Sequence, residues 1–85
     1  MSNIYDLFNL IGDNLRNIRN KKIKMTQEEF AEDIEMSRGF ISQIEGQNVN
    51  TGVSLDTLFY IAQKYNFDIR DFFDGYEKLM KENNN

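Results

Sequence analysis

The fold of this chain is decided by one continuous stretch, residues 26–46, which reads TQEEFAEDIEMSRGFISQIEG. Two helix starts stand in it: Thr26 with Glu29 forms a capping box, and Ser37 is a second N-cap. Apolar residues follow each cap at helical spacing, and Gly46 stands where the second helix should end. Two short helices joined by so tight a turn form a helix-turn-helix.

Helical patterns continue on both sides of this stretch, and nothing in the chain suggests a strand. Apolar residues recur at intervals of three or four, as the buried stripe of a helix requires. The expected outer elements are a helix over residues 4–20, a loop over 47–53, a helix over 54–66 with Leu55, Leu58, Ile61, Ala62 and Tyr65 inward, a short helix with Phe72 and Phe73, and one or two turns over 76–80. The predicted fold class is all-α: a compact five-helix domain over residues 1–80, its helix-turn-helix formed by helices 2 and 3, with a disordered tail over 81–85.

The composition excludes several classes of function. The 85 residues include no Cys and no His, which removes disulfides, thiolate metal sites, the commonest metal ligand and the commonest general base. We therefore expect no enzyme activity, no metal or other cofactor and no small-molecule substrate. The chain lacks both a long apolar run and the features of a signal peptide, so we expect a cytoplasmic protein with no membrane contact.

The charge distribution is compatible with a nucleic-acid partner, although the net charge of −4 is unusual for one. Within residues 14–47 six basic and six acidic residues cancel, and the remaining four basic and eight acidic residues supply the whole excess. The segment 16–24 contains five basic residues and no acidic one: Arg16, Arg19, Lys21, Lys22 and Lys24. This segment is expected to attract phosphates independently of sequence.

The segments 26–31, 37–46 and 54–58 together resemble the phage Cro and repressor family of five-helix domains. The resemblance covers about residues 10–73 and implies a DNA-binding domain whose second motif helix enters the major groove. The controller proteins of restriction-modification systems are family members of similar length. Three departures from the family are visible: Glu35 replaces the usual turn Gly, the connection between the first two helices is one residue longer, and the loop after Gly46 is about two residues longer and lacks the common Pro.

Helical spacing and the position in the motif predict the DNA contacts. Arg38, Gly39, Ser42 and Gln43 are left on the outer face of the second motif helix and are the predicted base contacts. Arg38 suits guanine, and Gln43 suits adenine. The resemblance implies that Gln27 grips a phosphate, as helix N-termini can. The full set of predicted phosphate contacts is Gln27, Ser37, Phe40, Gln47, Asn48, Arg16 and Lys22.

Aromatic residues beyond the fourth helix exceed what a small core needs, and such clusters mark interfaces. They predict a two-fold dimer through Phe67, Ile69, Phe72, Phe73 and Tyr76.

The favoured function is a homodimeric transcription regulator that binds a palindromic operator in double-stranded DNA, as phage repressors and restriction-modification controllers do. The alternative is a protein-interaction module, an antitoxin or anti-repressor built on the same fold. Acidic cover over the recognition face would favour the alternative.

Overall fold

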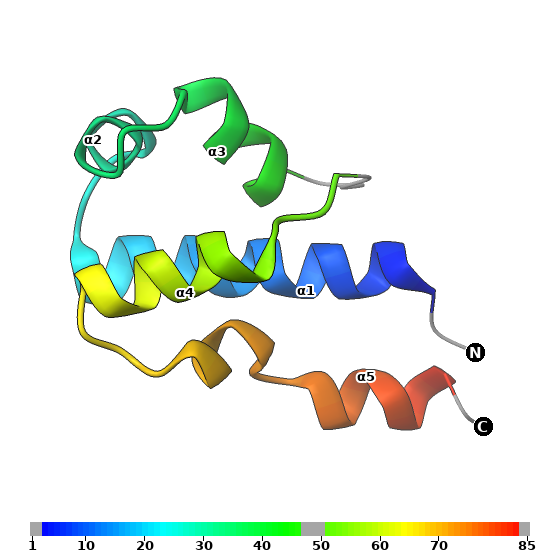
Figure 1. The fold of residues 1–85 in the computed structure, drawn as a ribbon. Helices are drawn as coiled ribbons and strands as arrows, with labels where there is room; N and C mark the ends of the chain where they lie inside the picture. Colours follow the sequence, from blue (N-terminus) through cyan, green and yellow to red (C-terminus); the bar gives the residue numbers. More distant parts are fainter. Residues whose placement is uncertain (1–2, 47–50, 84–85) are drawn as a thin grey trace.

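The computed structural model describes residues 3–46 and 51–83, which form helices and no strand. The elements are α1 (Ile4–Asn17), the π-helix η1 (Ile18–Ile23), α2 (Gln27–Asp33), α3 (Arg38–Glu45), α4 (Leu55–Lys64), the 3-10 helix η2 (Ile69–Phe73) and α5 (Tyr76–Asn83). Figure 1 shows three layers: α2 and α3 lie on one side of α1 and α4, and η2 and α5 lie on the other. The predicted all-α class with five α-helices is confirmed. The last helix continues to Asn83, into the segment 81–85 that we expected to be disordered.

The helix starts of the motif are where the sequence predicts them. The Thr26 hydroxyl accepts a hydrogen bond from the Glu29 amide at 3.1 Å, and the Glu29 carboxylate accepts one from the Thr26 amide at 2.9 Å. Ser37 accepts from the Phe40 amide at 3.0 Å, and Ser54 caps α4 in the same way. Each cap satisfies an amide that the first helical turn leaves without a partner.

The turn between α2 and α3 closes through a left-handed residue, Glu35, whose φ is 59°. The next amide, that of Met36, donates to the carbonyl of Ala31 at 2.9 Å and completes the helix end. Relatives use Gly here because a Cβ disfavours this backbone conformation by about 1 kcal/mol. The position that the resemblance assigned to Glu35 is therefore confirmed.

The core is a single apolar cluster to which α1, η1, α2, α3, α4 and η2 contribute side chains. Its buried members are Ile11, Leu15, Ile18, Phe30, Ala31, Ile34, Ile41, Ile44, Leu58, Ile61, Ala62 and Phe72. Gly12 sets the spacing of two layers, because a Cβ added to it would lie 2.0 Å from the Ile44 carbonyl oxygen. The backbone of α1 thus touches the backbone of α3, and only Gly permits this approach.

The long connection between α1 and α2 is absorbed by a change of helix type. The α-helix ends at Asn17, and the backbone continues as a π-helix to Ile23 rather than as the regular helix expected over 4–20. The Lys24 amide donates to the carbonyl of Arg19, five residues back, at 2.7 Å, and Lys24 takes a φ of 61°. A π-turn holds one residue more than an α-turn, so it accommodates the longer connection.

Two predictions for the apolar residues are wrong. Leu55 was expected inward, but it is 67% exposed, since spacing along a helix does not reveal where the packed neighbours end. Phe72 was expected at a dimer interface, but it is fully buried. The amide of Asn14 donates to the carbonyls of Phe72 and Asp74 at 2.7 and 2.9 Å and holds this segment against α1. Phe72 has no surface left with which to contact a second copy.

Candidate nucleic-acid interface

The outer face of α3 carries polar positions, and its inner face is apolar. Ile41 and Ile44 are buried in the core, which turns the opposite side of the short helix to solvent. The four positions predicted to contact bases are all exposed: Arg38, Gly39, Ser42 and Gln43. Among the described residues no acidic group forms an ion pair with Arg38. The guanidinium is therefore available to an external acceptor.

Gly39 has no steric role in the fold of its own chain. A Cβ built on it would meet only the Ser37 hydroxyl, at 3.9 Å, in contrast to the severe clash at Gly12. A glycine inside a helix costs about 1 kcal/mol relative to alanine, so it needs another reason to be there. Its bare backbone lies on the exposed face of α3 and allows a flat partner to come close.

Ser37 and Phe40 at the start of α3 are engaged with each other. The Phe40 amide donates to the Ser37 hydroxyl at 3.0 Å and also faces the Ser37 carbonyl at 3.2 Å. Phe40 therefore has no free amide with which to bind a phosphate, and its half-buried side chain packs against the core. The Ser37 hydroxyl accepts in this cap and keeps its own proton to donate. Of the two predicted phosphate contacts, only Ser37 retains a donor.

A buried ion pair fixes how α3 is held by the elements before it. Arg19 donates from Nε and Nη2 to the two carboxylate oxygens of Glu45 at 2.9 and 2.8 Å. The side chains are 8% and 1% exposed, and the hydrogen bonds that Arg19 donates to Glu45 raise the pKa of Arg19. A third bond runs from Arg19 Nη1 to the Met25 carbonyl at 2.8 Å. One guanidinium thus joins η1, the connection before α2 and the end of α3.

The pair overturns the expectation that Arg19 attracts phosphates, because its charge is buried and neutralised. The basic segment itself gave no sign of this, since the partner Glu45 stands far along the chain. Gln27 belongs to the same network: its amide donates to Glu45 at 3.2 Å. A primary amide has two N–H groups, so Gln27 keeps one for a phosphate while its position is fixed.

A groove lies between the end of η1, the start of α2 and Arg38 of α3. Its lining residues are Arg19, Asn20, Lys24, Met25, Thr26, Gln27, Glu28, Glu29 and Arg38. Lys24 and Arg38 contribute exposed cations from two different elements. The Glu29 carboxylate is turned toward Thr26, whose hydrogen bonds lower the pKa of Glu29. The groove therefore combines the amide of Gln27 with two cations that have no ion-pair partner in the described segments 3–46 and 51–83, and Glu28 is the adjacent acidic group.

A comparison with protein families agrees with this geometry. The helix-turn-helix family matches residues 15–72, more than half of the chain. The chain belongs to the helix-turn-helix family. The resemblance to Cro and repressor domains is thereby confirmed, and with it a DNA-binding, transcription-regulating kind of function. No curated protein and no solved structure matches this helix-turn-helix protein.

Two predicted phosphate contacts of the helix-turn-helix protein have partners within the chain. Arg16 donates to Asp13 at 3.0 Å and to the Glu45 carbonyl at 2.6 Å, so it binds the C-terminal end of α3. Lys22 pairs with Asp71 of η2 at 3.1 Å. This pair directs Lys22 toward η2, which lies on the opposite side of α1 from α2 and α3 (Figure 1). Lys22 is therefore removed from the predicted phosphate contacts. The cation that reaches the groove is Lys24 instead.

Gln47 and Asn48 lie outside the described residues. In the segments 3–46 and 51–83, no helix has the length and apolar character needed to cross a membrane. The same segments contain no group of His, Cys, Asp or Glu arranged to hold a metal ion.

Proposed function

We propose that this helix-turn-helix protein is a sequence-specific transcription regulator that reads operator bases with Arg38, Gly39, Ser42 and Gln43. The observation that carries the proposal is the exposed face of α3, where Arg38 has no ion-pair partner among the described residues. Arg16, Arg19 and Lys22, in contrast, are each paired with a carboxylate of the same chain. Gly39 on the same face has no role in packing.

Each base contact follows from the chemistry of its side chain. Arg38 can donate two parallel hydrogen bonds to guanine, and Gln43 can pair with adenine through its amide. A good bidentate contact discriminates against the wrong base by about 1–3 kcal/mol. Ser42 can reach a base edge or a phosphate, and Gly39 permits close approach of the backbone. Lys24, Gln27 and Ser37 are the proposed phosphate contacts, because each keeps a donor beside α3.

The operator is proposed to be palindromic and bound by a homodimer, with one α3 in each half-site. Two recognition helices on one face of DNA must lie one helical turn apart, about 34 Å. The dimer contacts that remain from the sequence prediction are Phe67, Ile69 and Phe73, which are half-buried, and Tyr76, which is 45% exposed. A repressor of the phage type and a restriction-modification controller both fit this description.

Selection of binding sites from random duplex DNA tests the proposal. The wild type should enrich an inverted repeat, and Arg38→Ala should lose its preference at one symmetric base pair. Lys24→Ala is the matched control, because loss of one phosphate contact weakens binding to all sequences equally. It should also reduce the slope of the logarithm of the binding constant against the logarithm of the salt concentration by about one. If the folded wild type enriches no sequence at low salt, the regulator proposal is wrong.

A protein-interaction module is the second candidate, and one observation favours it. The outer side of α2 and the following turn expose Glu28, Glu32, Asp33 and Glu35. This acidic surface borders the recognition face, although the groove beside α3 still contains Lys24 and Arg38. A protein that enriches no DNA and instead binds a basic partner through these carboxylates would support the second candidate.

A further inference from the structure

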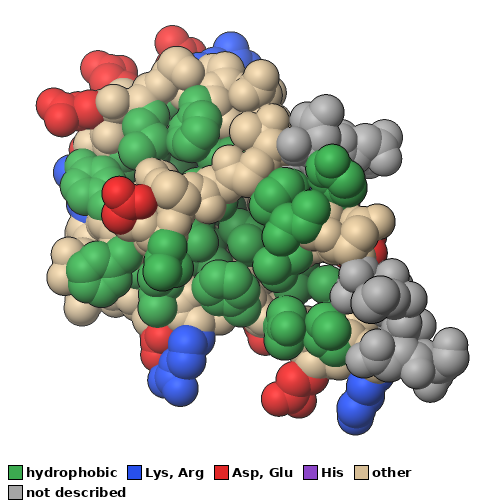
Figure 2. All heavy atoms as spheres, turned by 45° about the vertical axis from the view of Figure 1, so that its right-hand side comes forward, with side chains coloured by type: hydrophobic (Ala, Val, Ile, Leu, Met, Phe, Trp, Pro, Cys, Tyr) green, Lys and Arg blue, Asp and Glu red, His purple; other side chains and the backbone are tan. Residues whose placement is uncertain are grey.

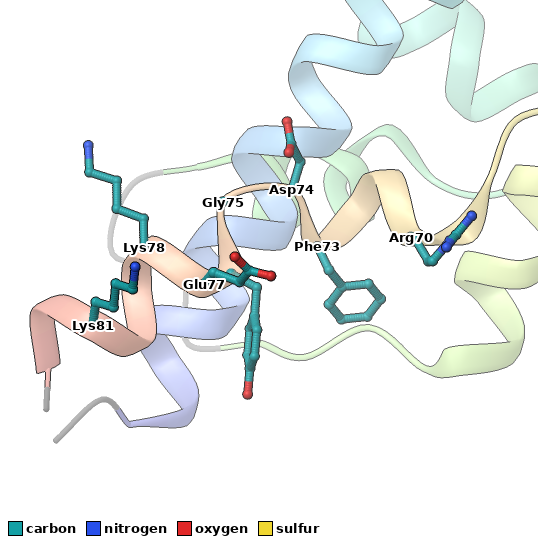
Figure 3. Close-up of a pocket in the computed structure, with 8 residues that line it drawn as sticks. Arg70, Phe73, Asp74, Gly75, Glu77, Lys78 and Lys81 are labelled. Carbon is teal, nitrogen blue, oxygen red and sulfur yellow. The ribbon is translucent and has the colours of Figure 1, made fainter.

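The groove beside Arg38, lined by residues 19–20, 24–29 and 38, differs from the other open surfaces of the molecule. We call it the η1–α2 groove. Another groove lies between η2 and α5, where Figure 3 shows Phe73 beside α5, with Lys78 and Lys81 toward one end. That layer is on the opposite side of α1 and α4 from α3 (Figure 1). The face in Figure 2 presents mainly hydrophobic side chains, with most charged side chains at its edge. The η1–α2 groove is polar and adjoins α3, so its donors are the ones that a DNA phosphate beside α3 would meet.

Asn20 lines the η1–α2 groove, although the sequence did not predict any contact for it. It is exposed and follows the buried Arg19 directly in the π-helix η1. Adjacent side chains diverge by about 100° on an α-helix, and the wider turn of a π-helix reduces that angle. The Asn20 side chain therefore stands beside the Arg19 guanidinium, whose Nη1 also donates to Asn20 Oδ1 at 3.0 Å.

This hydrogen bond determines which end of the Asn20 amide is left for a partner. A guanidinium has only donors, so the atom that faces Arg19 must be the amide oxygen. The NH2 group lies on the other side of the amide, and it donates no hydrogen bond within segments 3–46 and 51–83. An amide whose oxygen accepts from a cation is polarised, which makes its N–H groups stronger donors. Asn20 thus presents two N–H groups that can bind an external acceptor.

Gln27 is oriented by the other member of the same ion pair. Its Nε2 donates to Glu45 Oε1 at 3.2 Å, which leaves one N–H group of this amide without a partner among the bonds of the described residues. Arg19 thus holds the Asn20 amide by its oxygen, and Glu45 holds the Gln27 amide by its nitrogen. Both amides line the same groove, and the polar groups that they have left include N–H donors. The buried pair therefore presets two neutral donors beside the two exposed cations of the groove.

We infer that Asn20 binds a backbone phosphate of DNA in the η1–α2 groove and that Arg19 is the residue that positions its amide. The inference rests on the proposed function and adds to it a contact from η1. Phosphate oxygens accept hydrogen bonds from amides as well as from cations, and a duplex presents them along both strands. Of the two carboxylates at the groove, Glu29 is bonded within its own capping box, and Glu28 is outnumbered by the donor side chains.

Asn20→Asp separates a phosphate contact from a purely structural role. The carboxylate still accepts the hydrogen bond from Arg19, so the variant should be as stable as the wild type, but it loses both N–H groups and repels a phosphate. Its affinity for duplex DNA should fall by about 10-fold or more, equally for selected and random sequences, since a phosphate contact carries no base preference. Asn17→Asp is the matched control, because Asn17 is exposed one turn earlier and lines a different hollow with Lys21 and Lys22. The same added charge should change the affinity there by less than about 3-fold.

Asn20→Ala tests whether the contact is a neutral hydrogen bond. It should weaken duplex binding by about 10-fold at every salt concentration and leave the slope of the logarithm of the binding constant against the logarithm of the salt concentration unchanged, because no charge is lost. Lys24→Ala, in contrast, should reduce that slope by about one. Circular dichroism and urea denaturation verify that each variant is folded.

NMR of the Asn20 side-chain NH2 group gives a direct readout. Its signal should shift when duplex DNA is added, and it should do so in Arg38→Ala as well. A signal that shifts with a polyglutamate peptide and not with DNA would overturn the inference and assign the groove to an acidic protein. Sequence-selective binding that Asn20→Asp leaves unchanged, or that Asn17→Asp weakens as much, would overturn only the Asn20 contact. Binding without sequence preference that Asn20→Asp weakens would overturn only the regulator function.

Discussion

The ion pair between Arg19 and Glu45 makes the most demanding prediction, because it is buried and charged. Glu45→Gln keeps the shape of the side chain and removes only its charge, which leaves the Arg19 guanidinium buried without a counter-charge. Breaking a buried pair in this way costs about 3–5 kcal/mol. A domain of 85 residues has a total free energy of unfolding of about 4–13 kcal/mol, so the loss removes a large part of it.

Urea denaturation measures the effect. At a slope of about 1 kcal/mol per molar urea, the midpoint should fall by about 3 M or more. The matched control is Asp71→Asn, which breaks the pair between Lys22 and Asp71. Those side chains are 58% and 39% exposed, and exposed pairs contribute about 0–1 kcal/mol. Equal midpoint shifts for Glu45→Gln and Asp71→Asn would refute the reasoning.

A double variant checks the cause. Arg19→Met with Glu45→Leu replaces both charges by apolar groups of similar length, and such replacements of buried pairs are often neutral or stabilising. The double variant should therefore be more stable than either single variant. If it is as unstable as Glu45→Gln, the loss comes from the missing hydrogen bonds to Gln27 and Met25 and not from an unpaired charge.

Three further predictions concern single positions. Gly12→Ala should lower the free energy of unfolding by about 2–3 kcal/mol and the melting temperature by about 10–20 °C, because its Cβ would meet the Ile44 carbonyl oxygen; an unchanged melting curve would contradict the close approach. Gly39→Ala should stabilise the protein by up to about 1 kcal/mol and yet weaken operator binding, so the two assays should move in opposite directions. Bonds from Arg70 lower the pKa of Asp68 from 3.8 to about 2, so this contribution to stability is complete above about pH 4 and is lost as the pH falls through 2. Carboxyl NMR titration of Arg70→Ala should find the pKa of Asp68 back near its ordinary value; a pKa still near 2 would mean that Arg70 is not its cause.

Local rules were sufficient for the helix-turn-helix. Thr26 and Ser37 are caps whose partners lie within one turn, and the left-handed residue at Glu35 closes a turn of fixed length. Because each of these interactions joins near neighbours, a pattern in the sequence contains all of the information. The exposure of Arg38 and Gln43 follows in the same way, since the buried positions of α3 determine its outer face.

Features that depend on distant partners were missed. The role of Arg19 is set by Glu45, and the burial of Phe72 is set by α1, so neither follows from its own surroundings in the chain. The same limit applies to Leu55, whose apolar character suggested burial although no described element covers it. Gly12 gave no signal either, because a glycine in a helix does not indicate which backbone approaches it.

The buried pair has a consequence for how the protein responds to its ionic surroundings. In the proposed complex an exposed cation such as Lys24 acts on phosphates through water, where dissolved ions screen the attraction within about 10 Å. The link between Arg19 and Glu45 lies beneath the surface and is screened much less. Rising ionic strength should therefore release the nucleic acid long before it loosens the helix that reads it. The affinity for DNA should therefore change with ionic strength, while α3 keeps its conformation.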